Sequence, residues 1–166
     1  MDQDEMKENA QFLIDELPGK PLPGSVRIRC RYKNLVDFAK VYGFTDPKYV
    51  GPEENGIVAC KAFANHFTVK AIYKLVLGMK LEKDGEKKAF VRDPGKLLHA
   101  GNKYNWEDCV DIQDGDKLTI TGKWGNVWLV EKNMILFAEL LVEARNQEGE
   151  LVCKPTVRAA VRPGGY

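Results

Sequence analysis

The most regular hydrophobic pattern in the chain runs from Cys60 to Gly78. Two rows of apolar or small side chains repeat there every four residues, the spacing of neighbours on one side of an α-helix. The rows are Phe63, Phe67, Ala71 and Leu75, and Ala64, Thr68, Ile72 and Val76. The pattern predicts that residues 61–78 form the longest helix of the chain, mostly buried. Gly78 is expected to end it in a left-handed conformation.

After this segment the hydrophobic period changes to two, which is typical of β-strands. Alternation predicts strands over residues 95–108, 117–124, 134–146 and 151–162. The loop at residues 146–150 has the length of a hairpin connection, with Gly149 at the position most in need of a positive φ. Because short loops cannot make a parallel crossover, the last long strands must be antiparallel neighbours. The predicted fold class is α+β, with one long helix against the concave face of an antiparallel sheet.

The first part of the chain predicts shorter elements. A short helix is expected over residues 6–17, and the prolines and glycines at 18–24 then exclude regular structure. Alternation over residues 25–31 predicts a half-buried strand, with Val26, Ile28 and Cys30 facing inward. A second short helix is expected from an Asn34 N-cap to Gly43, followed by a loop over residues 44–59. Asp84-Gly85 predicts a turn in the charged stretch 80–88.

Composition narrows the class of protein. The chain has 166 residues, which suggests one domain, and we divide it into an N-terminal extension (1–24), a folded domain (25–162) and a tail (163–166). Its 25 basic and 24 acidic residues give a net charge of +1, so no general attraction to nucleic acid or anionic membrane is expected. An acidic N-terminus and the lack of a membrane-length apolar run favour a cytoplasmic location.

The four cysteines show no metal-ligand spacing. They lie far apart in the sequence, at Cys30, Cys60, Cys109 and Cys153. In a reducing compartment such cysteines are expected to be buried or half-buried free thiols rather than a disulfide framework. We therefore expect no metal site.

Several short motifs resemble a known family by their order and spacing. They are Leu17–Lys20, Asp37–Ala39, Asp46–Tyr49, His99–Trp106, Asp114–Leu118 and Asn146–Val152. Together, residues 16–162 resemble the MaoC-like enoyl-thioester hydratases and dehydratases, especially the N-terminal-type MaoC dehydratase domain. The resemblance implies a single hotdog fold, subunits that pair side by side, and an acyl-CoA or acyl-carrier-protein thioester as substrate without a further cofactor.

One motif departs from the family pattern. Active members carry Gly-Asp-x-Asn-Pro-x-His in the loop after the first helix, and its Asp and His form the catalytic dyad. The same frame here places Phe44 at the Asp position, Tyr49 at the His position and Asp46 at the Asn position. Phenylalanine cannot accept a proton, and tyrosine has an ordinary pKa of about 10, far from that of a base poised near neutrality. The dyad is therefore missing.

The resemblance also indicates candidate site residues. Asp46, Tyr49 and His99 are the groups that could replace the dyad. Substrate-binding candidates are Gly56, Ile57, Val58 and Ala59, whose backbone N–H groups precede the long helix, together with Phe63, His99 and Asn102. His66, also on the helix, is interpreted as a solvent- or interface-facing side chain.

Three functions remain open from the sequence. The leading interpretation is a hotdog subunit that binds acyl thioesters and acts with a dyad-bearing partner in hydration or dehydration of 2-enoyl/3-hydroxyacyl thioesters. The first alternative is a stand-alone (R)-specific enoyl-CoA hydratase that uses displaced residues. The second is a non-enzymatic acyl-CoA binding or assembly module. A homodimer, or a heteromer with the catalytic subunit, is expected because an unpaired sheet edge favours pairing with another chain.

Overall fold

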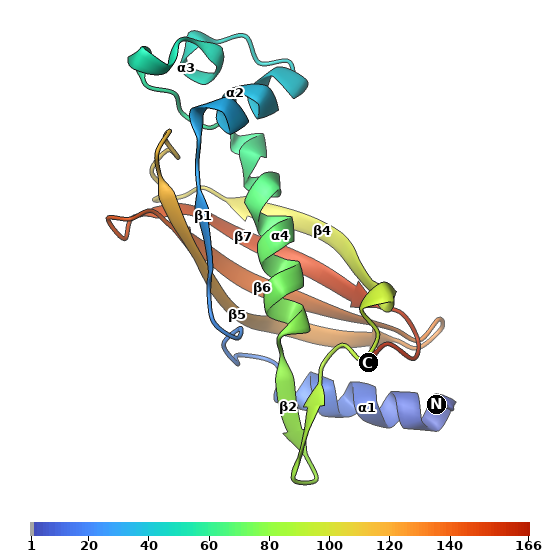
Figure 1. Cartoon of the computed structure of the whole chain (residues 1–166). Helices are drawn as coiled ribbons and strands as arrows, with labels where there is room; N and C mark the ends of the chain where they lie inside the picture. Colours follow the sequence, from blue (N-terminus) through green and yellow to red (C-terminus); the bar gives the residue numbers. More distant parts are fainter. Residues whose placement is uncertain (1) are drawn as a thin grey trace.

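The fold is a curled antiparallel sheet with one helix lying along its concave face (Figure 1). The computed structural model describes residues 2–166. Its helices are α1 (Gln3–Glu16), α2 (Tyr32–Val41), α3 (Pro47–Val50) and α4 (Ala64–Leu77), with 3-10 turns at Glu53–Asn55, Lys61–Phe63 and Pro94–Lys96. Its strands are β1 (Val26–Arg29), β2 (Lys80–Lys83), β3 (Glu86–Ala89), β4 (Leu97–Asn105), β5 (Lys117–Val130), β6 (Ile135–Arg145) and β7 (Leu151–Val161).

The predicted long helix is α4, extended at its start by the turn Lys61–Phe63. Every residue of the two predicted rows is buried, so the periodicity identified the core face correctly. Two expectations were wrong. At 14 residues α4 is no longer than α1, and Gly78 has a right-handed φ of −78°. The chain runs directly from Gly78 towards β2 without the reversal that a left-handed residue would give (Figure 1).

The five long-sheet strands follow the order β1-β5-β6-β7-β4, all antiparallel. This confirms the predicted fold class. Strand β5 is longer than predicted because a bulge between Trp124 and Val127 lets it continue to Val130. A second bulge between His99 and Gly101 explains the irregular pattern of β4. Gly149 has φ +84°, as the hairpin required.

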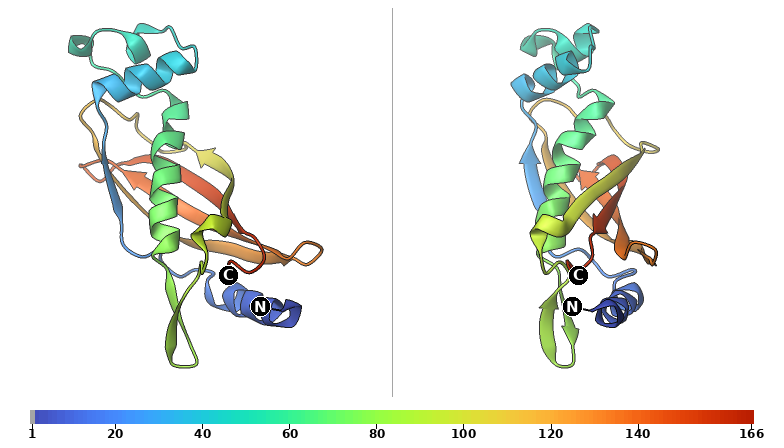
Figure 2. Two further views of the ribbon diagram at one scale, coloured as in Figure 1. Left: turned by 45° about the vertical axis from the view of Figure 1, so that its right-hand side comes forward. Right: turned by 90° about the vertical axis from the view of Figure 1, so that its right-hand side faces the viewer.

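The N-terminal helix is longer than predicted and packs onto the sheet. It begins at Gln3, where Asp2 caps it by accepting a hydrogen bond from the Glu5 N–H, and it buries Ala10 and Leu13. Figure 2 shows α1 below the sheet, next to the hairpin of β2 and β3. At the other end of the chain Tyr166 is buried, with its hydroxyl donating to a backbone carbonyl. Both terminal segments therefore pack against the same core.

The start of α2 differs from the prediction, whereas the turn between β2 and β3 confirms it. Helix α2 begins at Tyr32 after an extended Arg31, so Asn34 lies inside its first turn and is not the cap. The backbone after β1 stays extended as far as Arg31, so the helix starts at the next residue. The Asp84-Gly85 turn is confirmed, with positive φ at both residues.

All four cysteines are free thiols, as predicted. Three are buried, and Cys109 is partly exposed. No helix among residues 2–166 has the length and apolar character needed to cross a membrane.

Candidate functional site

The loop that should carry a catalytic dyad holds an aromatic pair. The rings of Phe44 and Tyr49 meet edge to face, with 5.1 Å between their centroids. Asp46 caps α3 by accepting a hydrogen bond from the Lys48 N–H at 3.0 Å, and its carboxylate is exposed. The loop lies beyond one end of the sheet, with α2 and α3 (Figure 1). These contacts pack and cap the loop, and the Asp46 carboxylate is paired with Lys48 Nζ at 3.8 Å rather than with a histidine.

The backbone donors before α4 are largely occupied. The N–H groups of Gly56, Val58 and Ala59 donate to backbone carbonyls, at 3.1, 3.0 and 2.7 Å. Ile57 is buried in the core. These N–H groups therefore hold the segment in place. They are not aimed at an open site.

Cys60 directly precedes the turn Lys61–Phe63 that leads into α4. Burial raises the pKa of its thiol, against the backbone N–H groups of Phe63 and Ala62, which lower it. Phe63 is fully buried and contacts the rings of Phe38 and His66. Phe63 is therefore a core residue at this end of α4.

His66, interpreted from the sequence as solvent- or interface-facing, is half-buried. Its ring is half-buried and stacks on Phe63 at a centroid distance of 5.1 Å, with Phe38 against its edge. Burial lowers the pKa of His66, and the positive charge of Lys70 lowers it further. The neutral imidazole therefore acts here as part of an aromatic cluster.

Polar side chains gather between α4 and the edge strand β4. They are Asn65, Thr68, His99, Asn102 and Tyr104, and we call them the α4–β4 polar cluster. The Tyr104 hydroxyl donates to Asn65 Oδ1 at 2.6 Å. Asn102 Nδ2 donates to the same oxygen at 3.1 Å and to the Tyr104 hydroxyl at 2.9 Å. At the far end, His99 Nε2 lies 2.9 Å from Asn102 Oδ1.

Thr68 connects the cluster to the core. It is fully buried, donates to the Ala64 carbonyl at 2.8 Å and lies 3.2 Å from the Tyr104 hydroxyl. Burial raises the pKa of Tyr104, and its polar contacts with the side chains of Thr68 and Asn102 lower it. The tyrosine is therefore a neutral hydroxyl near pH 7.

The sequence named only part of this cluster. It identified His99 and Asn102, and the structure brings them together. It missed Asn65, Thr68 and Tyr104. The available signal was Thr68 itself, a polar residue inside an otherwise apolar row, because a buried hydroxyl needs a partner. Nothing in the sequence showed that this hydroxyl, which donates to the Ala64 carbonyl of its own helix, would also lie beside a tyrosine 36 residues later.

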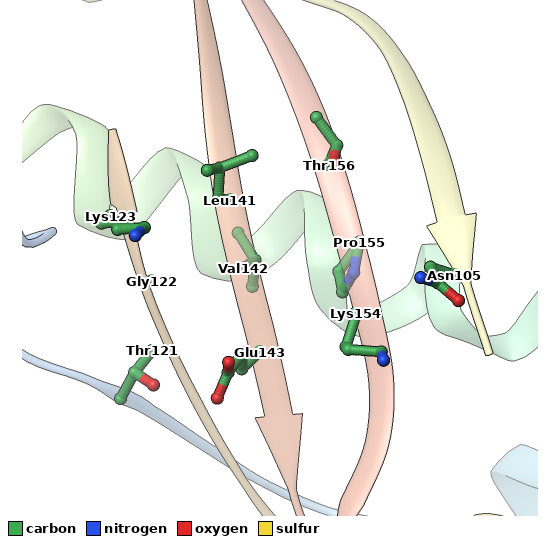
Figure 3. Close-up of a pocket in the computed structure, with 10 residues that line it drawn as sticks. All are labelled: Asn105, Thr121, Gly122, Lys123, Leu141, Val142, Glu143, Lys154, Pro155 and Thr156. Carbon is green, nitrogen blue, oxygen red and sulfur yellow. The ribbon is translucent and has the colours of Figure 1, made fainter. Parts of the chain in front are cut away.

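The largest hollow lies on the other face of the sheet. Figure 3 shows it over β5, β6 and β7, with α4 passing behind the strands. It measures about 570 Å³ and includes Lys123, Leu141, Glu143 and Lys154 in its lining. Smaller hollows of about 420 and 160 Å³ lie beside Arg29–Lys33 and beside the β4 bulge. Among residues 2–166 no group of His, Cys, Asp or Glu is arranged as metal ligands.

Neither histidine is paired with a carboxylate. His99 contacts Asn102 and His66 contacts aromatic rings, and the part of the chain that the structure describes contains no other histidine. A dyad of the kind needed for proton transfer to and from a thioester is therefore absent from residues 2–166.

Known structures share this architecture. The MaoC-like dehydratase from Rhodospirillum rubrum has 17% sequence identity and a TM-score of 0.61, over 89% of this chain and 94% of that one. The HadBC (3R-hydroxyacyl-ACP dehydratase) complex from Mycobacterium tuberculosis gives 12% identity and a TM-score of 0.65, over 87% and 97%. The ChsH1–ChsH2 complex from the same organism gives 13% and 0.60, over 89% and 99%.

At these identities the structures establish the fold alone. No protein in the curated set matches the chain. The family described as "FAS1-like, dehydratase domain region" matches residues 17–155, which is most of the chain. The protein therefore belongs to this dehydratase-region family and has the hotdog fold of the MaoC-like dehydratases.

Proposed function

We propose that this protein is a non-catalytic subunit of an enoyl-thioester hydratase or dehydratase. It binds the acyl thioester, and a partner hotdog subunit supplies the acid and base. The observation that carries the proposal is the aromatic pair of Phe44 and Tyr49 at the two dyad positions. Membership of the dehydratase-region family supports the reaction class. Two of the similar structures are heteromeric complexes, which is consistent with a partner.

A stand-alone hydratase built from displaced groups is the weaker candidate. It would need Asp46, Tyr49 and His99 to converge on one substrate. Asp46 and Tyr49 belong to α3 and its cap, whereas His99 is the third residue of β4. Figure 1 shows α3 beyond the end of the sheet and β4 along its margin. A non-enzymatic binding module has no observation in its favour beyond the missing dyad.

The partner docks, in this proposal, along β4 and the adjacent face of α4. Among residues 2–166, strand β4 pairs with β7 alone, so its other edge is open over nine residues. Beside that edge, α4 exposes Tyr73 and Leu77, each 37% accessible, and the residues around Leu98 form a shallow apolar hollow with Tyr73. The occupant is a second hotdog subunit: another copy of this chain when it is purified alone, and the dyad-bearing subunit in the active complex.

The test is steady-state hydration of crotonyl-CoA, followed by loss of enoyl-thioester absorbance. The chain alone should give little turnover, and adding a hotdog subunit with an intact Gly-Asp-x-Asn-Pro-x-His motif should restore it. Phe44→Asp combined with Tyr49→His restores the Asp and His of the dyad in this chain and should raise its activity above wild type. The matched control is Phe44→Asn with Tyr49→Gln, which adds polarity without an acid or a base. Full activity of the wild-type chain alone would overturn the proposal.

A further inference from the structure

The Asn65 carboxamide is bonded at only one of its two ends. Its Oδ1 accepts hydrogen bonds from both Tyr104 and Asn102. Asn102 donates to this oxygen through Nδ2, while its own Oδ1 lies 2.9 Å from His99 Nε2. Asn65 Nδ2 forms no hydrogen bond with any of residues 2–166. The two donors fix the amide plane and leave its N–H groups directed away from them.

The orientation of Asn65 is set by a chain of contacts rather than by a single one. Tyr104 is held by Thr68 and by Asn102, and Asn102 in turn by His99. A side chain needed only to tie α4 to β4 would require one such bond. Here two donors converge on one oxygen, which restricts rotation about the amide. A half-buried donor fixed in this way costs little reorganisation when a ligand binds.

The surroundings suit a ligand with a polar head on an apolar chain. Lys61 lies four residues before Asn65, in the 3-10 turn that leads into α4, and its ammonium is 5.5 Å from the ring centre of Trp106. Trp106 stacks on Tyr104 at 5.9 Å. Lys61 forms no ion pair among the described residues. Aromatic faces and a free cation therefore flank the Asn65 donor, with no carboxylate bonded to it.

We propose that Asn65 Nδ2 donates a hydrogen bond to the carbonyl oxygen of the acyl thioester, in an orientation set by Tyr104 and Asn102. The inference rests on the proposed thioester-binding function and assigns the residue that recognises the thioester group. A carbonyl oxygen accepts such a bond without a proton being transferred. Any negative charge that hydration places on that oxygen is stabilised by the same donor and by nearby Lys61.

The experiment compares two ligands that differ at this oxygen. Butyryl-CoA contains the thioester carbonyl, and S-butyl-CoA is the thioether that lacks it. Their dissociation constants are measured by titration calorimetry with the full chain. The wild type should bind butyryl-CoA about 3- to 10-fold more tightly, the effect of one neutral hydrogen bond. Asn65→Leu should abolish this preference, and Asn65→Asp should reverse it because a carboxylate oxygen faces the carbonyl.

Two tyrosine variants separate positioning from general damage. Tyr104→Phe removes one of the two donors that orient Asn65, so it should reduce the preference for butyryl-CoA. Tyr166→Phe removes a buried hydroxyl that donates to the Met134 carbonyl, outside the cluster, and the preference should stay as in the wild type. Circular dichroism melting confirms the fold of each variant, and Asn65→Asp retains the oxygen that Tyr104 and Asn102 need.

The possible failures are distinguishable. If the wild type binds neither ligand, the proposed thioester-binding function is wrong. If it binds both equally well, the function stands and the role of Asn65 is wrong. If it prefers butyryl-CoA and every folded Asn65 variant keeps that preference, another group recognises the carbonyl and the inference is likewise overturned.

Discussion

The loop at residues 43–49 and the α4–β4 polar cluster contrast in what they offer a substrate. The loop has the family's glycine and proline but replaces its proton-transfer groups by Phe44 and Tyr49, which pack on each other. The cluster has five polar side chains joined by hydrogen bonds, with an unbonded donor at Asn65. The loop therefore keeps the glycine and proline of the motif without its proton-transfer groups, whereas the hydrogen-bonded polar side chains lie between α4 and β4.

The two edge strands of the sheet, β1 and β4, also differ, in length and in charge. Strand β1 has four residues, and exposed arginines at Arg27 and Arg29 discourage another strand from pairing with it. Strand β4 has nine residues and contains one lysine, Lys103, and no arginine, aspartate or glutamate. The open edge thus lies on the side of the polar cluster, so a partner that docks there would place its own groups beside Asn65.

The largest expected effect concerns assembly. Tyr73→Glu places a charge on the exposed face of α4 beside β4, so self-association should weaken by tenfold or more, measured by light scattering over a concentration series. The matched control is Val41→Glu, because Val41 is 83% exposed on α2, next to the loop. It should leave assembly unchanged. If Val41→Glu dissociates the protein and Tyr73→Glu does not, the interface lies at the loop.

The next largest expected effect is a difference in the free energy of unfolding between variants of the α4–β4 polar cluster and variants of the loop at residues 43–49. Tyr104→Phe leaves the oxygen of Asn65 and the amide of Asn102 short of a partner, so the free energy of unfolding should fall by about 1–3 kcal/mol. Tyr49→Phe changes a tyrosine in the exposed loop and should cost at most about 0.5 kcal/mol. Both values come from urea denaturation. Equal losses would mean that the cluster is no better ordered than the loop.

The smallest expected effect is a difference in reactivity between the buried cysteines and the partly exposed one. Burial raises the pKa of Cys30 and Cys153 to about 12, against an ordinary value of 9.0. In the native protein at pH 8 a thiol reagent should therefore modify the partly exposed Cys109 first, and all four cysteines only after denaturation. Modification of Cys153 before Cys109 would show that the sheet opens readily.

The same pKa shifts predict how stability depends on pH. The folded state keeps the protons of Cys30 and Cys153 up to about pH 12, whereas the unfolded state loses them near pH 9. Their contribution is therefore complete below pH 9 and declines as the pH rises from 9 to 12. Cys153→Ala should flatten this decline in a urea series, and Cys109→Ala should change it less.

Much of the fold followed from periodicity. The rows of α4 and the alternation of β5, β6 and β7 predicted the core because each element buries one face with a fixed repeat. The boundaries of α1 and α2 were less accessible. Helix α1 starts at an Asp2 cap before the apolar residues begin, and α2 starts where β1 ends rather than at a capping side chain.

The candidate site was predictable only where it was local. The loss of the dyad could be read from Phe44 and Tyr49, since both lie in one short motif. The α4–β4 polar cluster joins Asn65 and Thr68 to Tyr104 across more than 30 residues, and that pairing depends on the register of β4. No local pattern specifies which strand lies beside the helix, so three of its five members were missed.

In the proposed function, this chain binds the thioester but lacks the groups that transform it. The most direct measurement is the rate of crotonyl-CoA hydration by the purified chain alone, compared with the same chain plus a dyad-bearing hotdog subunit whose own contribution is subtracted. We expect turnover near the uncatalysed rate for the chain alone and a clear increase in the mixture. Rapid hydration by the chain alone, abolished by Asp46→Asn, Tyr49→Phe or His99→Ala, would contradict it and identify the group that acts instead.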